Sequence, residues 1–419
     1  MEIRSMTIAA GRIVAPSQLK LALRNISRHR TRTLISLSAI AFGVVALLLA
    51  GGFIEWIYWA IREAAIQTGL GHIQISRPGF RAAGFADPSA YLLASDAAEL
   101  KTVRSAPGAV VLDQRFVLNG LASSGEITVA FTGEAVDPEA DKSISKVLGV
   151  TGENLSGADP SGVLLGSGLA NSLGIKRGDR VSFIVSRPGG GINAVEGSVR
   201  GTFETGVKGH DDSAVRMPLA LGSQLLKLRG AHVWVVGLDA TEHTDETMAY
   251  LRARLPSDRF ELASWRDLSD FYRKTVVLLS RQIYVVAVLI GVIIILGISN
   301  TLTMNVLERT GEIGTLMAMG TPRGAILRLF MLEGVLLGVI GGLAGLGIGF
   351  GLAELLSYVG IPMPPPPGRR TGYSAQIIIT FPLALAACGI AIMSTTLASV
   401  YPAWKAASLP IVDALRHNR

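Results

Sequence analysis

Residues 34–61 read LISLSAIAFGVVALLLAGGFIEWIYWAI, and this stretch decides the fold. A membrane-spanning helix needs about 20 consecutive, mainly apolar residues. The stretch exceeds that length with a single charged residue, Glu55, and it lies between Arg32 and Arg62. The sequence therefore predicts a first transmembrane helix at 34–61.

Three further apolar stretches lie close together toward the other end of the chain. They predict transmembrane helices at 281–305, 326–359 and 377–404. The long region between the first two, 62–280, is mostly polar. The predicted fold is an α-helical membrane domain of four transmembrane helices plus a mixed α/β domain inserted between the first and second helices.

The composition is that of a membrane protein. Of 419 residues, 49% are hydrophobic and only 17% are charged, which is low for a soluble domain. The net charge of +7 is located largely beside the apolar stretches, and no nucleic-acid module is present, so nucleic acid is not expected as a partner. The single cysteine, Cys388, lies within the fourth apolar stretch and excludes an intrachain disulfide.

Basic residues set the predicted orientation. Lys20, Arg24, Arg28, Arg30 and Arg32 precede the first apolar stretch. By the positive-inside rule, both termini (1–33 and 405–419) and the short loop 306–325 are cytoplasmic, whereas 62–280 and 360–376 lie outside. The basic residues also surround apolar positions at helical spacing, which predicts an amphipathic helix at the inner membrane surface.

A signal peptide is the competing interpretation of the first stretch. Small residues in 47–52 favour it. The apolar length exceeds a signal core, and the preceding region is long, so a retained anchor is the preferred interpretation.

The region 62–280 is expected to fold as an α/β domain. Alternating runs at 72–75, 181–185 and 233–236 predict strands, and 96–103 and 245–255 predict amphipathic helices. Residues 163–185 predict a strand, a helix, a turn at Gly178-Asp179 and a second strand. The glycines 189–191 predict a hairpin tip.

Catalytic motifs are absent from the sequence. It contains no Gly-x-x-x-x-Gly-Lys-Ser/Thr phosphate loop, no His-Glu-x-x-His and no Gly-x-Ser-x-Gly. The run His210-Asp211-Asp212 is expected to be a solvated turn rather than a metal site, because adjacent residues do not face one point in regular structure. We expect no catalytic residue, no metal and no cofactor bound by this chain.

Glycine recurs at four-residue spacing in the third apolar stretch. Gly334, Gly338 and Gly342 form one series, and Gly341, Gly345 and Gly349 form another. Small residues at this spacing let helix backbones approach closely in lipid. Packing within the chain and a subunit interface or sliding contact are both open, as are structural and conformational roles for Glu333.

The interior loop carries the strongest local signal, VLERTGEIGTLMAMGTP at 306–322. Ile313, Leu316 and Gly320 fall on one helical face, while Glu308, Arg309 and Glu312 supply charge. Gly320-Thr321-Pro322 ends the helix. Such a short amphipathic helix can dock into a groove of a cytoplasmic partner, or lie at the membrane interface.

Four segments together resemble a known family. These are ERTGEIGTLMAMGTPRGAILRLFMLEGVLLGVIGGLAG (308–345), YPAWKAASLPIVDALR (401–416), LALRNISRHRTRTLISLSAIAFGV (21–44) and SGLANSLGIKRGDRVSF (167–183). They are similar to the FtsX-like or MacB-type permeases of ABC transporters, which include the lipoprotein-releasing permeases. The resemblance covers essentially the whole chain.

The resemblance implies a permease of the bacterial inner membrane with a periplasmic core domain. It implies that a separate ABC ATPase, which uses ATP and Mg²⁺, binds the coupling residues of the interior loop. These are Glu308, Arg309, Glu312, Ile313, Leu316, Met319 and Gly320. A second permease, identical or different, membrane lipids and a periplasmic carrier protein are the other implied partners.

The implied mechanism is mechanotransmission, in which closure of the ATPases moves the spans and the outer domains. The implied cargo is a lipid, a lipoprotein or another hydrophobic molecule. Two features depart from the family pattern: Met317 stands where many relatives carry a basic residue, and the loop MPPPPG at 363–368 predicts a rigid polyproline II segment.

Two other functional classes are weighed against transport of cargo by an ABC system. The alternative is a signalling permease that uses the same movement to activate a periplasmic cell-wall hydrolase or sensor. A stand-alone secondary transporter is disfavoured, because the spans lack paired charges and an inverted repeat.

Overall fold

The computed structural model describes residues 30–84, 87–186, 190–363 and 373–410, together with Ala22 and Arg24. The chain divides into two compact units, each described separately below. The helical unit comprises Met1–Ile57, Val277–Ile361 and Ser374–Arg419, and the α/β unit comprises Tyr58–Val276 and Pro362–Tyr373. Apart from Ala22 and Arg24, the predicted amphipathic helix before the first span lies outside the described residues. The MPPPPG loop beyond Met363 and the last nine residues lie outside them as well.

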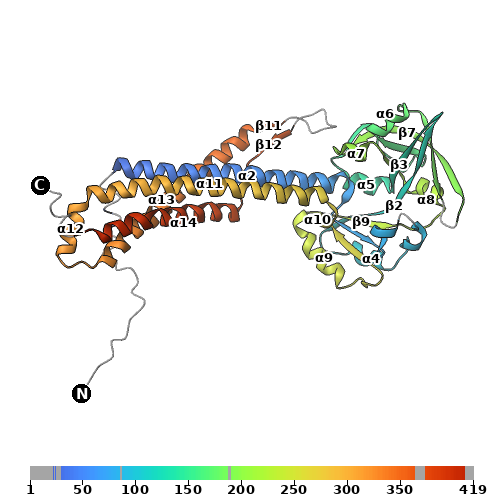
Figure 1. Ribbon diagram of the computed structural model, residues 1–419. Helices are drawn as coiled ribbons and strands as arrows, with labels where there is room; N and C mark the ends of the chain where they lie inside the picture. Colours follow the sequence, from blue (N-terminus) through green and yellow to red (C-terminus); the bar gives the residue numbers. More distant parts are fainter. Residues whose placement is uncertain are drawn as a thin grey trace, which may run out of the picture. The chain divides into compact units, whose positions relative to one another are not determined.

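Among the described residues, four helices are long and apolar enough to cross a membrane. They are α2 (Arg30–Ala65), which continues into the π-helical turn η1 (Ile66–Leu70), α11 (Asp270–Glu308), α13 (Arg323–Val359) and α14 (Phe381–Ser408) (Figure 1). The first three are longer than the predicted spans, because a helix continues into polar sequence wherever its hydrogen bonds can form.

The helical unit has its own apolar core. Side chains from α2 (Ile40, Val44), α11 (Ile294, Ile298) and α14 (Ala391) meet there. Alanine dominates the α14 side, so the helices can approach closely. At the start of α14, the Thr380 side chain accepts a hydrogen bond from the N–H of Leu383, and Pro382 occupies the first turn, which is why the helix begins at Phe381 rather than at residue 377.

The α/β unit is built on a ten-stranded sheet, part of which closes into a barrel. The ring runs β2–β3–β8–β5–β7–β6 and returns to β2, because β2 pairs with both β3 and β6. These strands are β2 (Ala109–Ser124), β3 (Ile127–Val136), β5 (Gly162–Gly166), β6 (Arg180–Ser186), β7 (Ile192–Glu204) and β8 (Ala214–Pro218).

Alternation along the barrel strands separates the inside from the outside. Phe116, Leu118, Phe131 and Phe183 point into one shared apolar core, and the residues between them face outward. Two helices, α6 (Ser167–Leu173) and α8 (Leu219–Leu226), add leucines to this core.

The other part of the sheet follows the order β10–β1–β9–β2. Its strands are β1 (Ile73–Ser76), β9 (Val233–Leu238) and β10 (Glu261–Ser264), joined by the first half of β2. Helices α4 (Glu99–Arg104) and α9 (Thr244–Arg252) contribute to the apolar core of this part, which surrounds Trp234.

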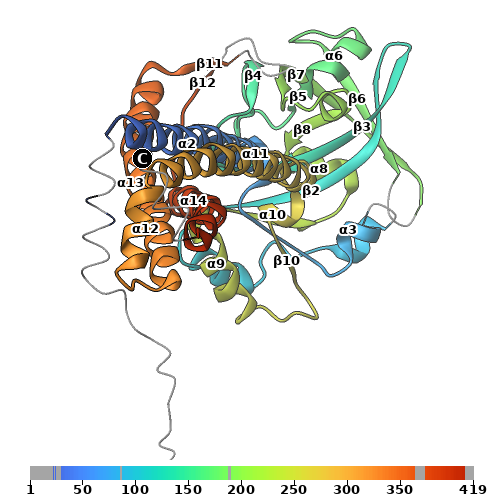
Figure 2. The same cartoon turned by 60° about the vertical axis from the view of Figure 1, so that its left-hand side comes forward.

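The remaining elements are short. They are α3 (Phe80–Ala83), η2 (Pro88–Tyr91), α5 (Pro138–Ile144), β4 (Gly149–Gly152), α7 (Lys208–Asp211), η3 (Thr241–His243), α10 (Trp265–Leu268), α12 (Thr310–Ala318), β11 (Ile361–Met363) and β12 (Tyr373–Ala375). Figure 2 shows the same elements from a second direction.

Several local predictions are confirmed. The strands expected at 72–75, 181–185 and 233–236 are β1, β6 and β9, and the helices expected near 96–103 and 245–255 are α4 and α9. The strand–helix–turn–strand order predicted for 163–185 is β5, α6 and β6, with Gly178 at φ +95° in the turn.

One local prediction is wrong. The run 210–212 is not a solvated turn, because Asp211 is only 5% exposed. Its carboxylate accepts hydrogen bonds from both the backbone N–H (3.0 Å) and the hydroxyl (2.6 Å) of Thr205. Asp211 therefore fixes the loop that precedes α7.

Candidate coupling site

The interior loop forms the helix α12, and its two ends are defined by local sequence. Arg309 stands at the N-cap, where its carbonyl accepts the N–H of Ile313 at 2.9 Å. Past the other end, Gly320 adopts φ +96°. There the N–H of Thr321 donates to the Leu316 carbonyl (3.1 Å) and that of Gly320 to the Met317 carbonyl (3.0 Å). This is a Schellman motif, which a glycine at this position favours.

One face of α12 is buried against the ends of the other helices of its unit. Ile313 is 2% exposed and Met317 is 6% exposed. They join Val306, Phe330 and Ala403 in one apolar cluster. Ile313 therefore packs inside the unit, and Met317 fills a core position rather than standing where a basic residue would meet solvent.

Arg309 connects α12 to α13. Its guanidinium lies 3.2 Å from Glu312 and 3.4 Å from Glu333, and it sits over the ring of Phe330. Because Glu333 is only 2% exposed, its carboxylate must be paired inside the unit. The arrangement shows a structural pair for Glu333, one of the two roles that the sequence leaves open.

Glu308 forms a two-pronged ion pair with Arg32, which joins the end of α11 to the start of α2. Both side chains are partly exposed. A paired guanidinium and carboxylate fix relative orientation as well as proximity. Of the predicted coupling residues, Glu308 and Arg309 thus also hold helices of this unit together.

The outward surface of α12 is formed by the residues between its buried positions. Glu312 and Met319 are exposed, Met319 by 70%, and Thr315 and Gly320 are exposed beside them. Leu316 is half-buried. We call Glu312, Thr315, Leu316, Met319 and Gly320 the α12 outer surface.

The two glycine series of α13 face different helices. A Cβ atom built on Gly334 would lie 2.6 Å from the Ser399 side chain, and one on Gly338 would lie 2.2 Å from Thr395, both on α14. Gly342, in the same series, lies nearest Cys388 and Ala391 of α14.

The second series faces α2. A Cβ on Gly341 would lie 2.8 Å from Ile40, one on Gly345 2.7 Å from Val44, and one on Gly349 2.6 Å from Leu48. A side chain at any of these three positions would collide with α2. Both series therefore serve packing within the chain, with α13 in close contact with α2 on one side and α14 on the other.

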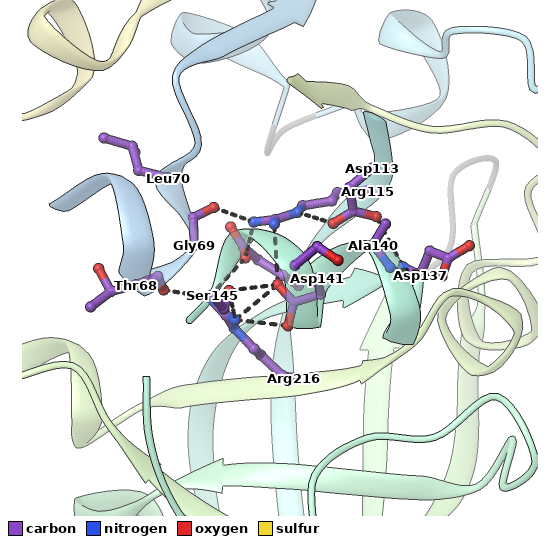
Figure 3. A network of polar contacts seen from close by, with 12 residues as sticks. Thr68, Gly69, Leu70, Asp113, Arg115, Asp137, Ala140, Asp141, Ser145 and Arg216 are labelled. Atoms are coloured by element: carbon purple, nitrogen blue, oxygen red, sulfur yellow. Dashed lines mark hydrogen bonds and ion pairs between the residues drawn. The ribbon is translucent and has the colours of Figure 1, made fainter. Parts of the chain in front are cut away.

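A buried polar network lies on the outer wall of the barrel, and no sequence motif predicts it (Figure 3). Arg115 of β2 is 1% exposed. Its guanidinium donates to Asp113 at 2.6 Å, to Glu134 at 3.0 Å and to Asp141 at 3.1 Å. The signal in the sequence is the pair Asp113 and Arg115, two charged residues on the same face of one strand.

A second guanidinium completes the network. Arg216 of β8 is 5% exposed and donates from Nη1 to both oxygens of Asp141, at 3.0 and 2.9 Å, and to the hydroxyl of Ser145 at 2.7 Å. Asp141 is held in place by α5, which begins where the Asp137 side chain accepts hydrogen bonds from two backbone N–H groups. Asp141 thus links two strands of the barrel.

The protonation of this network follows from burial and from its charges. Burial raises the pKa of Asp113 to about 6, although Arg115 opposes the shift. Burial also raises the pKa of Asp141, but Arg216 and Arg115 outweigh it and hold that pKa below its ordinary value. Asp141 is the fixed anion between the two guanidiniums.

No cluster of three or more histidine, cysteine, aspartate or glutamate side chains suited to a metal ion occurs within the described ranges. The features described above connect elements to one another: they are capped helix ends, buried ion pairs and close helix contacts.

Two family models match the chain. The model described as FtsX-like permease C-terminal matches residues 284–411, and the MacB-like periplasmic core domain matches residues 33–254, more than half of the chain.

Named relatives include an uncharacterized ABC transporter permease, MJ1507, of Methanocaldococcus jannaschii. It is 22% identical over 94% of this chain and 96% of its own length. The uncharacterized ABC transporter permease YknZ of Bacillus subtilis is 36% identical over 29% of this chain and 28% of its own length. The macrolide export ATP-binding/permease protein MacB of Psychrobacter arcticus is 30% identical over 40% of this chain and 24% of its own length. The chain thus aligns with only about a quarter of the last two proteins.

Among solved structures, the periplasmic region of MacB from Actinobacillus actinomycetemcomitans matches 51% of this chain and 94% of its own chain. It is 12% identical, with a TM-score of 0.36.

Proposed function

We propose a function from one premise: the chain belongs to the family of ABC transporter permeases with an FtsX-like C-terminal region and a MacB-like periplasmic core domain. In the proposal it is the transmembrane subunit, and it couples ATP hydrolysis by a separate ATPase to movement of the α/β unit. The α/β unit lies in the periplasm, α12 in the cytoplasm, and the four long helices in the inner membrane.

The observation that carries the proposal is the packing of α12. Ile313 and Met317 are buried among side chains of α11, α13 and α14, and Arg309 ties α12 to Glu333. A force applied to the α12 outer surface would therefore reach three long helices directly. A loosely attached loop would absorb such a force instead.

The partner in this proposal is an ATPase that docks on the α12 outer surface, with two permeases and two ATPases in the working unit. MacB of Psychrobacter arcticus is named an ATP-binding/permease protein, so both activities occur in one chain there. The present sequence has no Walker phosphate loop, and ATP and Mg²⁺ belong to the partner in this proposal.

For cargo we propose a hydrophobic molecule, a lipid, a lipoprotein or an exported small compound, taken up on the periplasmic side. The names of relatives support export: one is a macrolide exporter and another a pyoverdine exporter. Mass spectrometry of lipids and proteins that co-purify in mild detergent would identify the class.

The coupling role is tested by co-purification of the ATPase with variants of the α12 outer surface. Glu312→Lys and Met319→Asp are expected to lower ATPase recovery at least fivefold, because both side chains are exposed and neither belongs to the apolar cluster around Ile313 and Met317. Glu312→Lys also breaks the pair with Arg309, so Met319→Asp is the variant that changes no ion pair. Glu126→Lys, an exposed charge reversal between β2 and β3, is the matched control.

Charge reversal at Glu308 alone would also break its pair with Arg32. It is therefore compared with the double variant Arg32→Glu/Glu308→Arg, which restores an intrachain pair. Full ATPase recovery with both Glu312→Lys and Met319→Asp would refute the docking role.

A further inference from the structure

The end of the first long helix carries unpaired backbone acceptors that must find partners. The last carbonyl groups of a helix have no donors within the helix. Here α2 passes into η1, where Gly69 has φ +125°. This turn directs the carbonyl groups of Thr68 and Gly69 toward the barrel (Figure 3).

Both carbonyl groups are bound by the buried guanidiniums. Arg216 donates from Nη2 to the Thr68 carbonyl at 2.7 Å, and Arg115 donates from Nη1 to the Gly69 carbonyl at 2.6 Å. Cations at the end of a helix also interact favourably with its dipole. Because Asp141 holds both arginines, the helix end is fixed to β2, β8 and α5 at once.

A second set of bonds holds the preceding turn of α2. The carboxylate of Glu63 accepts a hydrogen bond from the Thr241 hydroxyl at 2.9 Å. The hydroxyl oxygen of Thr241 lies 3.2 Å from Nε2 of His72. Nδ1 of His72 accepts from the Leu238 N–H at 3.0 Å. Arg62 pairs with Glu242 at 3.1 Å. The end of α2 is therefore bonded to the barrel and to η3, which His72 connects to β9.

The start of α11 is attached to the same unit differently. Arg273 donates to the Asp267 carbonyl at 2.9 Å and pairs with Asp270, and the Tyr272 ring packs edge-on to Trp265. Arg273 and Asp270 are exposed, at 53% and 64%. The ion pair is in solvent, and of the contacted residues only Trp265 is buried. All three contacts join residues close together in sequence, so they constrain the helix less than the buried network does.

We propose that Arg115 and Arg216 form the rigid joint through which movement of the first long helix reaches the α/β unit, with α11 as the compliant connection. The inference rests on the proposed function. Arg115 and Arg216 are positioning residues, because they act on the helix end and on no cargo or nucleotide.

The test uses the full permease in complex with its ATPase in lipid nanodiscs. Two quantities are measured: the ATP hydrolysis rate, and the change in hydrogen–deuterium exchange of β2, β3 and β8 when ATP and vanadate are added. In Arg216→Lys, a single ammonium cannot reach Asp141, Ser145 and the Thr68 carbonyl together. We expect the exchange response to fall to less than half while hydrolysis changes less than twofold.

Gly69→Ala reaches the same joint without changing any charge. Its Cβ would lie 1.9 Å from Nη2 of Arg216, and its φ of +125° disfavours a side chain. As for Arg216→Lys, we expect the exchange response to fall to less than half while the ATP hydrolysis rate changes less than twofold. This variant keeps the test decisive if Arg216→Lys folds poorly.

Arg273→Ala, at the start of α11, is the matched control and should keep the full response. A full exchange response in both Arg216→Lys and Gly69→Ala would overturn the proposal that these arginines form the joint. So would an equal loss in Arg273→Ala. If the unaltered complex binds its ATPase but shows no exchange response to nucleotide, the proposed function fails first, and the joint fails with it.

Discussion

At the scale of single residues, His232 shows how burial sets a protonation state. Its ring lies between Phe80 and Phe116, with centroids 5.3 and 5.2 Å away. Nδ1 accepts the N–H of Val117 at 3.1 Å, so the proton of the neutral ring is on Nε2, which faces the Pro88 carbonyl at 3.1 Å. Burial lowers the pKa of His232 to about 4.

This pKa predicts a pH dependence of stability. In the unfolded chain a histidine titrates near pH 6.5. The folded state favours the neutral ring, so the contribution of His232 is complete above about pH 6.5 and is lost as the pH falls toward 4. The full contribution is about 3 kcal/mol. Hydrogen exchange at Val117, corrected for intrinsic rates, should show protection decreasing from pH 7 to pH 4.5.

The control is His232→Gln, which can accept and donate hydrogen bonds but does not titrate. The difference in Val117 protection between pH 7 and pH 4.5 should be smaller in this variant, although carboxylates elsewhere still contribute. Equal differences in the two proteins would exclude His232 as the group responsible.

At the scale of elements, α13 packs closely against two neighbouring helices. Its two glycine series bring it against α14 and α2, and glycines on its other faces have open space around them. A Cβ at Gly338 would lie 2.2 Å from the Thr395 hydroxyl and 3.0 Å from the Ile392 backbone. At Gly347 nothing lies within 4 Å. The same substitution on one helix should therefore have opposite consequences.

We predict that Gly338→Ala lowers the stability of the purified permease by about 1–3 kcal/mol, because the helices must separate to admit the methyl group. Gly347→Ala should be neutral or stabilising by up to about 1 kcal/mol, because alanine has the higher helix propensity. Thermal unfolding in one detergent, followed by circular dichroism, compares the two. Equal melting temperatures would show that this contact does not contribute.

At the scale of the whole molecule, the orientation of the units in the membrane can be measured directly. In a Cys388→Ser background, Glu126→Cys places a thiol in an exposed turn of the α/β unit, and Ala318→Cys places one on the exposed side of α12. A membrane-impermeant maleimide should label Glu126→Cys in cells whose outer membrane alone is permeabilised. Ala318→Cys should be labelled only after the inner membrane is opened. The reverse pattern would invert the proposed topology.

The sequence predicts well those features that depend on short stretches of chain. The apolar stretches and the alternating runs at 181–185 and 233–236 depend on neighbours in sequence, and the structure has helices and strands there. The end of α12 at Gly320 also follows from adjacent residues.

Features that depend on distant pairing could not be predicted from the sequence. The barrel closes because Leu121 lies opposite Ile184, and no local pattern encodes that register. Asp141 meets Arg216 across 75 residues of chain. Helical spacing grouped Ile313 with Leu316 and Gly320, but only the packed neighbours reveal that Ile313 faces inward while Gly320 is exposed.

The barrel gives the two arginines an unusual setting. β2 and β8 flank β3, so Arg115 and Arg216 bind side chains or project from three successive strands of a closed barrel. An open sheet can bend at its rim and leave the rest still. In a closed barrel every strand is hydrogen-bonded to a neighbour on each side. A displacement of β2, β3 and β8 must therefore be accommodated by the opposite strands, β6 and β7, which have to change shape as well.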